Sequence, residues 1–297
     1  MRPILRPGLQ ILRRDVRSLQ LGLDWPGVEA VWETPGLRAV LASVDGFRDV
    51  EGVLLAAREQ GVSWAEAEAG LDVLLDRGAL VDRSATRRTG VDESTWAAWW
   101  LLAGPGRCAD ELLAEQRERR ICVQGSGRVA DVVRSLLRAS PTGWCNERDE
   151  ADLLVIATDT EPARAWADEA MHTGIPHVWV FVRDTVGVVG PFVDPGKTAC
   201  LRCVDASRAA LDPAWPTLLA SSFAAPLAAP ACDPILATLI GAWVAQDALL
   251  WSAGLRPHTW GAVIEIPQGC GAVQTATFSP HPHCGCGWPV WQETMES

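Results

Sequence analysis

Short apolar runs separated by polar, proline and glycine residues open the chain, and helical spacing follows. Three runs have the length of short strands, at 9–12, 19–23 and 28–32. Three segments with helical spacing come next, at about 37–43, 48–60 and 64–77. A last short apolar run near 79–81 completes the series. This order predicts a winged-helix α+β domain over residues 1–85.

The third of these helices has a clear start signal. Ser63 and Glu66 have the spacing of a capping box, in which hydroxyl and carboxylate bond to each other's backbone N–H. Leu71, Leu74 and Leu75 then recur at helical spacing. We therefore expect a well-defined helix over 64–77.

Residues 86–117 predict a connector, with helical stretches broken at 104–106. Beyond it, from residue 118 to 297, apolar strand patterns alternate with helical ones. The predicted strands lie at 121–123, near 144, at 153–157 and at 178–182, and the predicted helices at 129–139, 161–173 and 233–253. Such alternation is typical of a parallel sheet with helices on both faces, a Rossmann-type α/β domain.

The cysteines of this second domain form two short pairs far apart in the chain, Cys200 with Cys203 and Cys284 with Cys286. Two such pairs can supply four thiolates to one tetrahedral zinc ion, which predicts a closed, structural site. His281 or His283 could replace a thiol. The alternatives are four unligated cysteines or a redox role for the first pair. Four other cysteines are interpreted as packed apolar side chains: Cys122, Cys145, Cys232 and Cys270.

A glycine turn lies between the first strand and the first helix of this domain. Gly125, Gly127 and Ala130 have the spacing of a dinucleotide fingerprint, whose glycines let the backbone approach a phosphate at a helix N-terminus. Glu147 or Asp149 lies about 20 residues on, where an acid could hold a ribose. The alternative is an empty turn, kept because the fold requires it.

Composition narrows the function classes. Apolar residues make up 48% of the 297 residues and charged residues 21%, as in ordinary globular proteins. The formal net charge of −11 argues against nucleic acid as a partner, because phosphates are bound by Lys and Arg. No apolar run is long enough for a membrane span and no signal peptide is evident, so we expect a cytoplasmic protein with reduced thiols and no membrane partner.

Several strings of the second domain resemble the E1/ThiF/MoeB superfamily. They are ADLLVIATDT at 151–160, the segment from GIPHVWV to Cys203, CDPILATLIGAWVAQDALLWSAG at 232–254, and the closing His-Pro-x-Cys-x-Cys. Together they span about 118–290. The string at 194–203 and the N-terminal domain are most similar to the ocin-ThiF-like proteins, which bind leader peptides for YcaO-type cyclodehydratases and carry a RiPP recognition element.

This resemblance implies a site and partners. A precursor leader peptide would add as a strand beside 28–33 and pack against helix 64–77, with Val31, Leu71 and Leu75 as candidate contacts. The alternative for each of these three side chains is a place in the core. A YcaO-type enzyme and a second copy of the chain, in a homodimer, would be the other partners.

The resemblance also implies what adenylation would need, and the chain departs from it. The family uses an Arg and a Lys near an Asn-Leu-x-Arg motif, which this chain lacks, and Lys197 is its only lysine. Asp159 matches the family's metal-binding Asp, and Arg128 could contact a phosphate or be solvated. We therefore expect zinc as the cofactor, doubtful use of ATP, and a leader-peptide-binding partner protein rather than an enzyme.

Three alternatives remain. One is an active ThiF-like, ATP-dependent adenylyltransferase, against which the single lysine argues. Another is a DNA-binding winged helix, whose helix 64–77 carries four acidic residues and one arginine. The third is a nicotinamide-dependent dehydrogenase, for which the sequence offers no convincing base.

Overall fold

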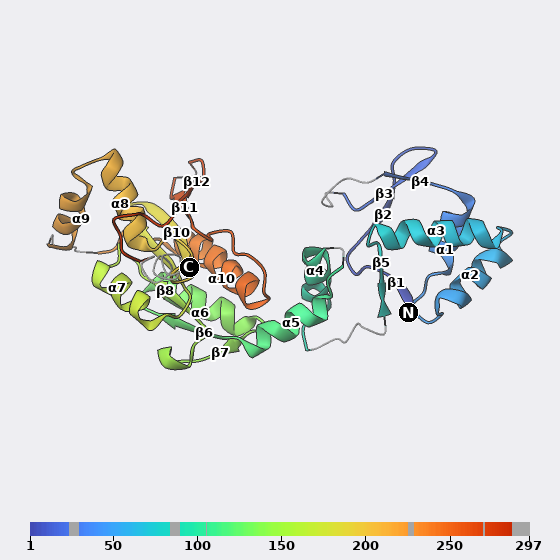
Figure 1. Ribbon diagram of the computed structural model, residues 1–297, viewed down its shortest axis with the longest axis horizontal. Coiled ribbons are helices and arrows are strands. Elements are labelled where there is room, and N and C mark those ends of the chain that lie inside the picture. The colour runs from blue at the N-terminus through green and yellow to red at the C-terminus, as the bar shows by residue number, and fades with distance from the viewer. Residues whose placement is uncertain (24–29, 84–89, 105, 225–228, 270, 287–297) are drawn as a thin grey trace, which may run out of the picture. The chain divides into compact units, whose positions relative to one another are not determined.

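The computed structural model describes residues 1–23, 30–83, 90–104, 106–224, 229–269 and 271–286 (Figure 1). Its chain divides into two compact units, Met1–Ala114 and Glu115–Ser297. Of the segments singled out from the sequence, several parts lie outside the described residues: 28 and 29 of the third strand, 84–89 where the first domain meets the connector, residue 105 of the connector break, Cys270 and the tail 287–297.

The first unit combines short strands with helices. Its strands are β1 (Pro3–Leu5), β2 (Ile11–Arg13), β3 (Ser18–Leu21), β4 (Ala30–Trp32) and β5 (Leu80–Asp82). Its helices are α1 (Pro35–Ser43), α2 (Val50–Glu59), α3 (Trp64–Asp76) and α4 (Glu93–Ala103), and α5 (Ala109–Glu118) crosses into the second unit. Strands β2, β3 and β4 form one antiparallel sheet in that order, and β1 pairs with β5. Strand β1 was not predicted, because three residues are too short to display a period of two.

Local side-chain chemistry sets the helix starts. The predicted capping box is confirmed: Ser63 Oγ accepts from the Glu66 N–H, and Glu66 accepts from the Ser63 N–H at 2.8 Å. Thr34 and Asp49 cap α1 and α2 in the same way. Because these caps satisfy N–H groups that have no partner inside the helix, each helix begins within a residue of its cap.

Helices α1 and α3 cross in close contact at two glycines. A Cβ at Gly36 would meet the carbonyl of Glu66, and one at Gly70 would meet the backbone of Gly36 and Leu37. Only glycine permits this approach, which closes the core of the unit around side chains such as Leu37 and Leu74, 1% and 0% exposed.

The second unit is built on a seven-stranded sheet. Its strands are β6 (Arg120–Gln124), β7 (Gly143–Trp144), β8 (Leu153–Ala157), β9 (His177–Arg183), β10 (Val186–Val193), β11 (Ala262–Pro267) and β12 (Gln274–Thr277). Its helices are α6 (Arg128–Ala139), a 3-10 turn at Arg148–Glu150, α7 (Arg164–Thr173), α8 (Leu201–Leu211), α9 (Trp215–Ala224) and α10 (Pro234–Ser252).

The expectation of a wholly parallel sheet was wrong. The strand order is β12-β11-β10-β9-β8-β6-β7, and only β7, β6, β8 and β9 are parallel. Strands β9 and β10 are joined by a tight turn at Asp184 and Thr185, so β10 runs antiparallel, and β11 and β12 follow in antiparallel pairs. A connection of two residues is too short for a parallel crossover, which needs a dozen residues or more.

Helices cover both faces of this sheet, as expected. Alternate strand residues such as Val155 and Val180 pack with α6 and α10, while their neighbours Leu154 and Trp179 pack with α7 and α8. By length and composition helix α10 is apolar enough to cross a membrane, but 56% of this apolar stretch is buried inside the protein. Its contacts with α6, β9 and β10 are those of a core helix.

Candidate functional site

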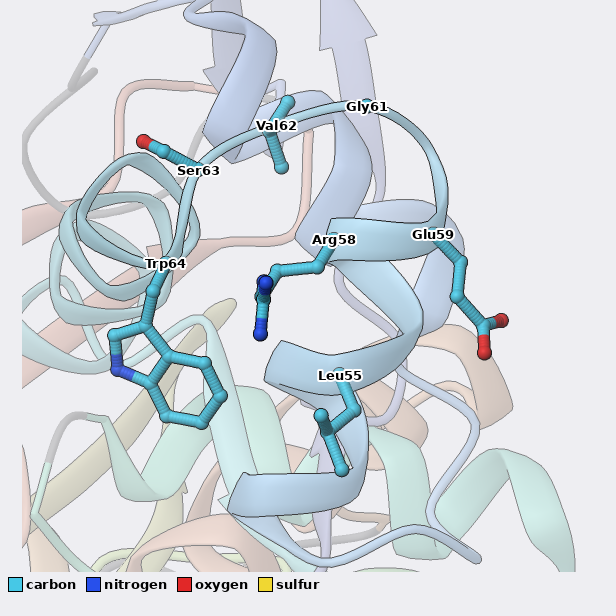
Figure 2. Close-up of a pocket in the computed structure, with 7 residues that line it drawn as sticks. All are labelled: Leu55, Arg58, Glu59, Gly61, Val62, Ser63 and Trp64. Carbon is cyan, nitrogen blue, oxygen red and sulfur yellow. The ribbon is translucent and has the colours of Figure 1, made fainter.

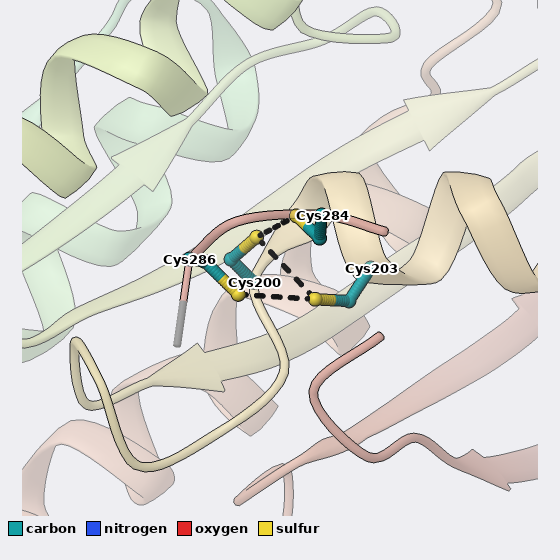
Figure 3. A group of neighbouring side chains, drawn as sticks. All are labelled: Cys200, Cys203, Cys284 and Cys286. Atoms are coloured by element: carbon teal, nitrogen blue, oxygen red, sulfur yellow. Dashed lines mark hydrogen bonds between the residues drawn. The ribbon is translucent and has the colours of Figure 1, made fainter. Parts of the chain in front are cut away.

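The four paired cysteines converge in space. Cys200 lies at the N-cap of α8 and Cys203 in its first turn, while Cys284 and Cys286 follow β12 (Figure 3). All four Sγ atoms lie within 4.8 Å of one another. The Sγ–Sγ distances are 3.7 Å for Cys200–Cys203, 3.5 Å for Cys200–Cys284 and 3.3 Å for Cys203–Cys286.

These distances fit a metal held by four sulfurs. A tetrahedron with zinc–sulfur bonds of about 2.3 Å has sulfur atoms about 3.8 Å apart. Hydrogen bonds with Cys200 and Cys286 lower the pKa of Cys203, while the hydrogen bonds with Cys203 and Cys286 raise the pKa of Cys200, so the cluster favours a thiolate at Cys203. The His281 N–H also donates to the Cys203 sulfur at 3.2 Å. The thiolate is the form that binds metals, so the donor set suits a metal ion such as zinc.

The glycine turn after β6 is filled by the protein itself. The Asp159 carboxylate accepts the backbone N–H groups of Arg128 and Val129 at 2.8 and 2.9 Å. A Cβ at Gly127 would clash with this carboxylate, and one at Gly125 would clash with the carbonyl of Ala157. Packing against the end of β8 therefore explains both glycines without a nucleotide.

A second helix N-terminus nearby is also capped by a carboxylate. Asp233 accepts from the Leu236 N–H at 2.7 Å at the start of α10, which packs along α6. Burial raises the pKa of the adjacent Cys232 to about 11, and the charge of Asp159 adds to the shift. At both helix starts the position that suits a phosphate is thus occupied by an Asp.

A small hollow of about 300 Å³ lies beside the carboxyl ends of β6 and β8. This is the point where the strand order reverses, and where ligands bind in open α/β sheets. Trp166 and an ion pair between Arg148 and Glu169, 2.6 Å apart, line it together with Gln124. The sequence analysis missed these residues, because nothing in their spacing indicates that they meet.

The candidate ribose-binding acids and the single lysine lie away from this hollow. Glu147 and Asp149 are exposed and do not line this hollow. Lys197 Nζ pairs with Asp194 at 3.0 Å, and its side chain is 72% exposed. The single lysine is thus engaged in the loop before α8.

The candidate peptide contacts lie in the first unit. Val31 and Leu71 are 4% and 3% exposed within its core, and Leu75 packs against that core, half-buried. Val31 and Leu71 therefore pack in the core of the first unit and are not exposed to a peptide on its surface.

Strand β4 forms an edge of its sheet among the described residues. The Glu33 N–H donates to the Arg17 carbonyl at 2.8 Å, which fixes the phase of the β3–β4 ladder. Hydrogen-bonded and non-hydrogen-bonded residue pairs alternate along an antiparallel ladder. Trp32 and Ala30 are in the non-hydrogen-bonded pairs, so their backbone N–H and C=O groups point away from β3. The Trp32 side chain is 73% exposed beside them.

The mixed seven-stranded sheet, the glycine turn and the cysteine cluster are together consistent with an E1-like α/β fold. Among solved structures, the chain is similar to the heterocyclase TruD, with a TM-score of 0.72 and 17% identity over 98% of this chain and 44% of TruD. It is also similar to Escherichia coli MccB, with a TM-score of 0.68 and 14% identity over 97% of both chains. The structure of MccB with SeMet MccA is similar as well, with a TM-score of 0.67 and 16% identity over 97% of this chain and 100% of that chain.

These likenesses concern the fold. The chain spans less than half the length of TruD. Neither a protein-family model nor a curated protein matches the sequence.

Proposed function

We propose that the chain binds the leader segment of a ribosomal precursor peptide and presents it to a separate YcaO-type cyclodehydratase. In this proposal residues 1–85 are a winged-helix RiPP recognition element, 86–117 a connector and 118–297 the E1-like body. The observation that carries the proposal is the open edge of β4, whose Ala30 and Trp32 backbone groups point away from β3.

An added peptide strand would use this edge for backbone hydrogen bonds and neighbouring side chains for specificity. The exposed indole of Trp32 would lie beside it, and Leu75 on α3 would contact it from the core side. Two similar solved structures add support, since each holds a partner molecule: a heterocyclase in complex with substrate and cofactor, and MccB with SeMet MccA.

The proposed body holds zinc and does not adenylate. Cys200, Cys203, Cys284 and Cys286 would hold the ion, which stabilises the fold and has no open position for chemistry. Asp159 already occupies the amides that Gly125 and Gly127 would offer a phosphate. A homodimer in the cytoplasm, bound to neither DNA nor membrane, completes the proposal.

Titration of the full-length chain with leader peptides encoded beside its gene tests the binding. We expect a leader to bind at micromolar concentration or below. We also expect the KM of the cognate YcaO-type enzyme for the full precursor to be lower in the presence of this chain than in its absence. Failure of every neighbouring leader to bind would contradict the proposal.

The second candidate function is ATP-dependent adenylyl transfer, favoured by the retained glycine turn and the hollow at the switch point. Pyrophosphate exchange into ATP with the peptide present distinguishes the two. We expect none, whereas exchange that Asp159→Asn abolishes would make the chain an enzyme.

A further inference from the structure

A second concave surface lies in the first unit, on helices rather than on the β4 edge. A hollow of about 900 Å³ opens between the end of α2 and the start of α3. Residues 55–64 alone supply its lining, and none comes from β2, β3 or β4. Leu55 and Trp64 form apolar walls that are 47% and 38% exposed (Figure 2).

The cation in this hollow is free to bind a ligand. Figure 2 shows the guanidinium of Arg58 between the Trp64 indole and the Leu55 side chain. Among the described residues, no oxygen accepts a hydrogen bond from this guanidinium. Arg13, Arg38 and Arg48 of the same unit each pair with a carboxylate.

Glu59 and Glu66 lie close to Arg58 along the sequence, and neither forms an ion pair with it among the described residues. Glu59 lines the hollow too, but its side chain extends away from that of Arg58 in Figure 2. Glu66 is held in the capping box, where it accepts from the Ser63 N–H and Oγ at 2.8 and 2.6 Å, and these bonds lower its pKa. A positive charge flanked by apolar walls therefore stays available to an incoming group.

We propose that this hollow binds a peptide segment in which a bulky apolar side chain lies next to a carboxylate. The apolar side chain would pack against the exposed surface of Leu55 or Trp64, and the carboxylate would pair with the fork of N–H donors on the Arg58 guanidinium between them. The occupant is an acidic, apolar segment of a partner protein. The site is separate from the β4 edge and does not depend on binding of a leader there.

Fluorescence anisotropy with two labelled hexapeptides tests this inference on the full-length chain. One probe is acetyl-Gly-Leu-Glu-Phe-Glu-Gly-amide, and the other has Gln in place of both Glu residues. We expect the acidic probe to bind at least about tenfold more tightly than the neutral one, the usual weight of a hydrogen bond to a charged group.

Two variants with the same change in net charge separate the site from general electrostatics. Arg58→Gln is expected to weaken the acidic probe about tenfold, while Arg138→Gln on α6 leaves its affinity unchanged. Leu55→Ser is expected to weaken both probes, because it removes an apolar wall.

Three outcomes would overturn the inference. They are equal binding of the two probes, equal effects of Arg58→Gln and Arg138→Gln, and no binding of the acidic probe at millimolar concentration. Loss of leader-peptide binding with the probe results intact would overturn only the proposed function. A dimer in ultracentrifugation that Arg58→Gln dissociates, without probe binding, would assign the hollow to a second copy of the chain.

Discussion

The carboxylate of Asp159 occupies the place at the start of α6 where a phosphate would bind. Its two oxygens accept two consecutive backbone N–H groups, and it sits against Gly127, where no other residue would fit. A side chain in this position stabilises the helix and excludes an anion from the same amides.

Replacing Asp159 with Ala is therefore expected to lower the free energy of unfolding by about 1–2 kcal/mol, the usual weight of a helix cap. Urea denaturation followed by circular dichroism measures it. Asp131→Ala is the control, because this exposed acid lies in the same first turn and pairs with Arg134 at 3.3 Å instead of capping the helix. Equal losses in the two variants would contradict the capping role.

His177 adds a pH dependence at the residue scale. Its side chain is 1% exposed at the start of β9, and burial lowers its pKa from 6.5 to about 4. Below pH 6.5 the imidazole of His177 binds a proton in the unfolded chain but stays neutral in the folded chain. Its contribution to the free energy of unfolding is therefore fully present above pH 6.5 and is lost as the pH falls towards 4. The loss from this group amounts to about 3 kcal/mol.

Urea midpoints of the wild type and His177→Phe between pH 7 and pH 4 test this sign. We expect the variant to lose less stability than the wild type over that range. His172→Phe, which changes an exposed histidine on α7, should keep the wild-type slope. Parallel curves for all three proteins would show that His177 is not the titrating group.

At the scale of elements, the open edge of β4 makes a sharp test possible. Ala30→Pro removes a backbone N–H that points away from β3, so the existing β3–β4 ladder keeps its hydrogen bonds. We expect it to weaken leader binding about tenfold, through the lost hydrogen bond and the bulk of the ring, with little change in stability.

Ala30→Val is the matched control, because valine keeps the N–H and suits a strand. Calorimetric titration of both variants gives the comparison. Unchanged binding to Ala30→Pro would mean that the peptide does not pair with this edge.

Helices and buried strands with strong local signals were predicted, whereas helices α8 and α9 were not. The capping box of α3 and the apolar runs of β8 and α10 are legible within a few residues of sequence. Strand β10 and the antiparallel half of the sheet were missed. The direction of β10 relative to β9 depends on the length of the turn that joins them. An apolar run has the same sequence pattern whether its strand is parallel or antiparallel to its neighbour.

At the scale of the whole molecule, the cysteine cluster ties α8 to the segment beyond β12. Cys200 and Cys286 are separated by more than eighty residues, yet their sulfurs belong to one group within 4.8 Å. A metal there closes a long loop and fixes the end of the sheet, so its binding energy adds to folding.

We expect one zinc ion per purified chain, measured by plasma mass spectrometry, and its loss in Cys284→Ser. Cys232→Ser is the control, because this buried thiol lies outside the cluster. Chelation should lower the thermal midpoint of the wild type and leave that of Cys284→Ser unchanged. Full zinc content in Cys284→Ser would contradict the ligand assignment.

Sequence alone determined the capping box of α3, the strand β8, the helix α10, the glycine turn and the grouping of four cysteines into two short pairs, because each depends on neighbours along the chain. Tertiary structure decided that the two cysteine pairs meet, that Asp159 closes the turn and that Val31 and Leu71 lie in the core. It also decided that Arg58 lies beside Trp64 with no carboxylate partner in the part of the chain that the structure describes. Those facts depend on distances between side chains that lie on different elements, which only the packed chain brings together.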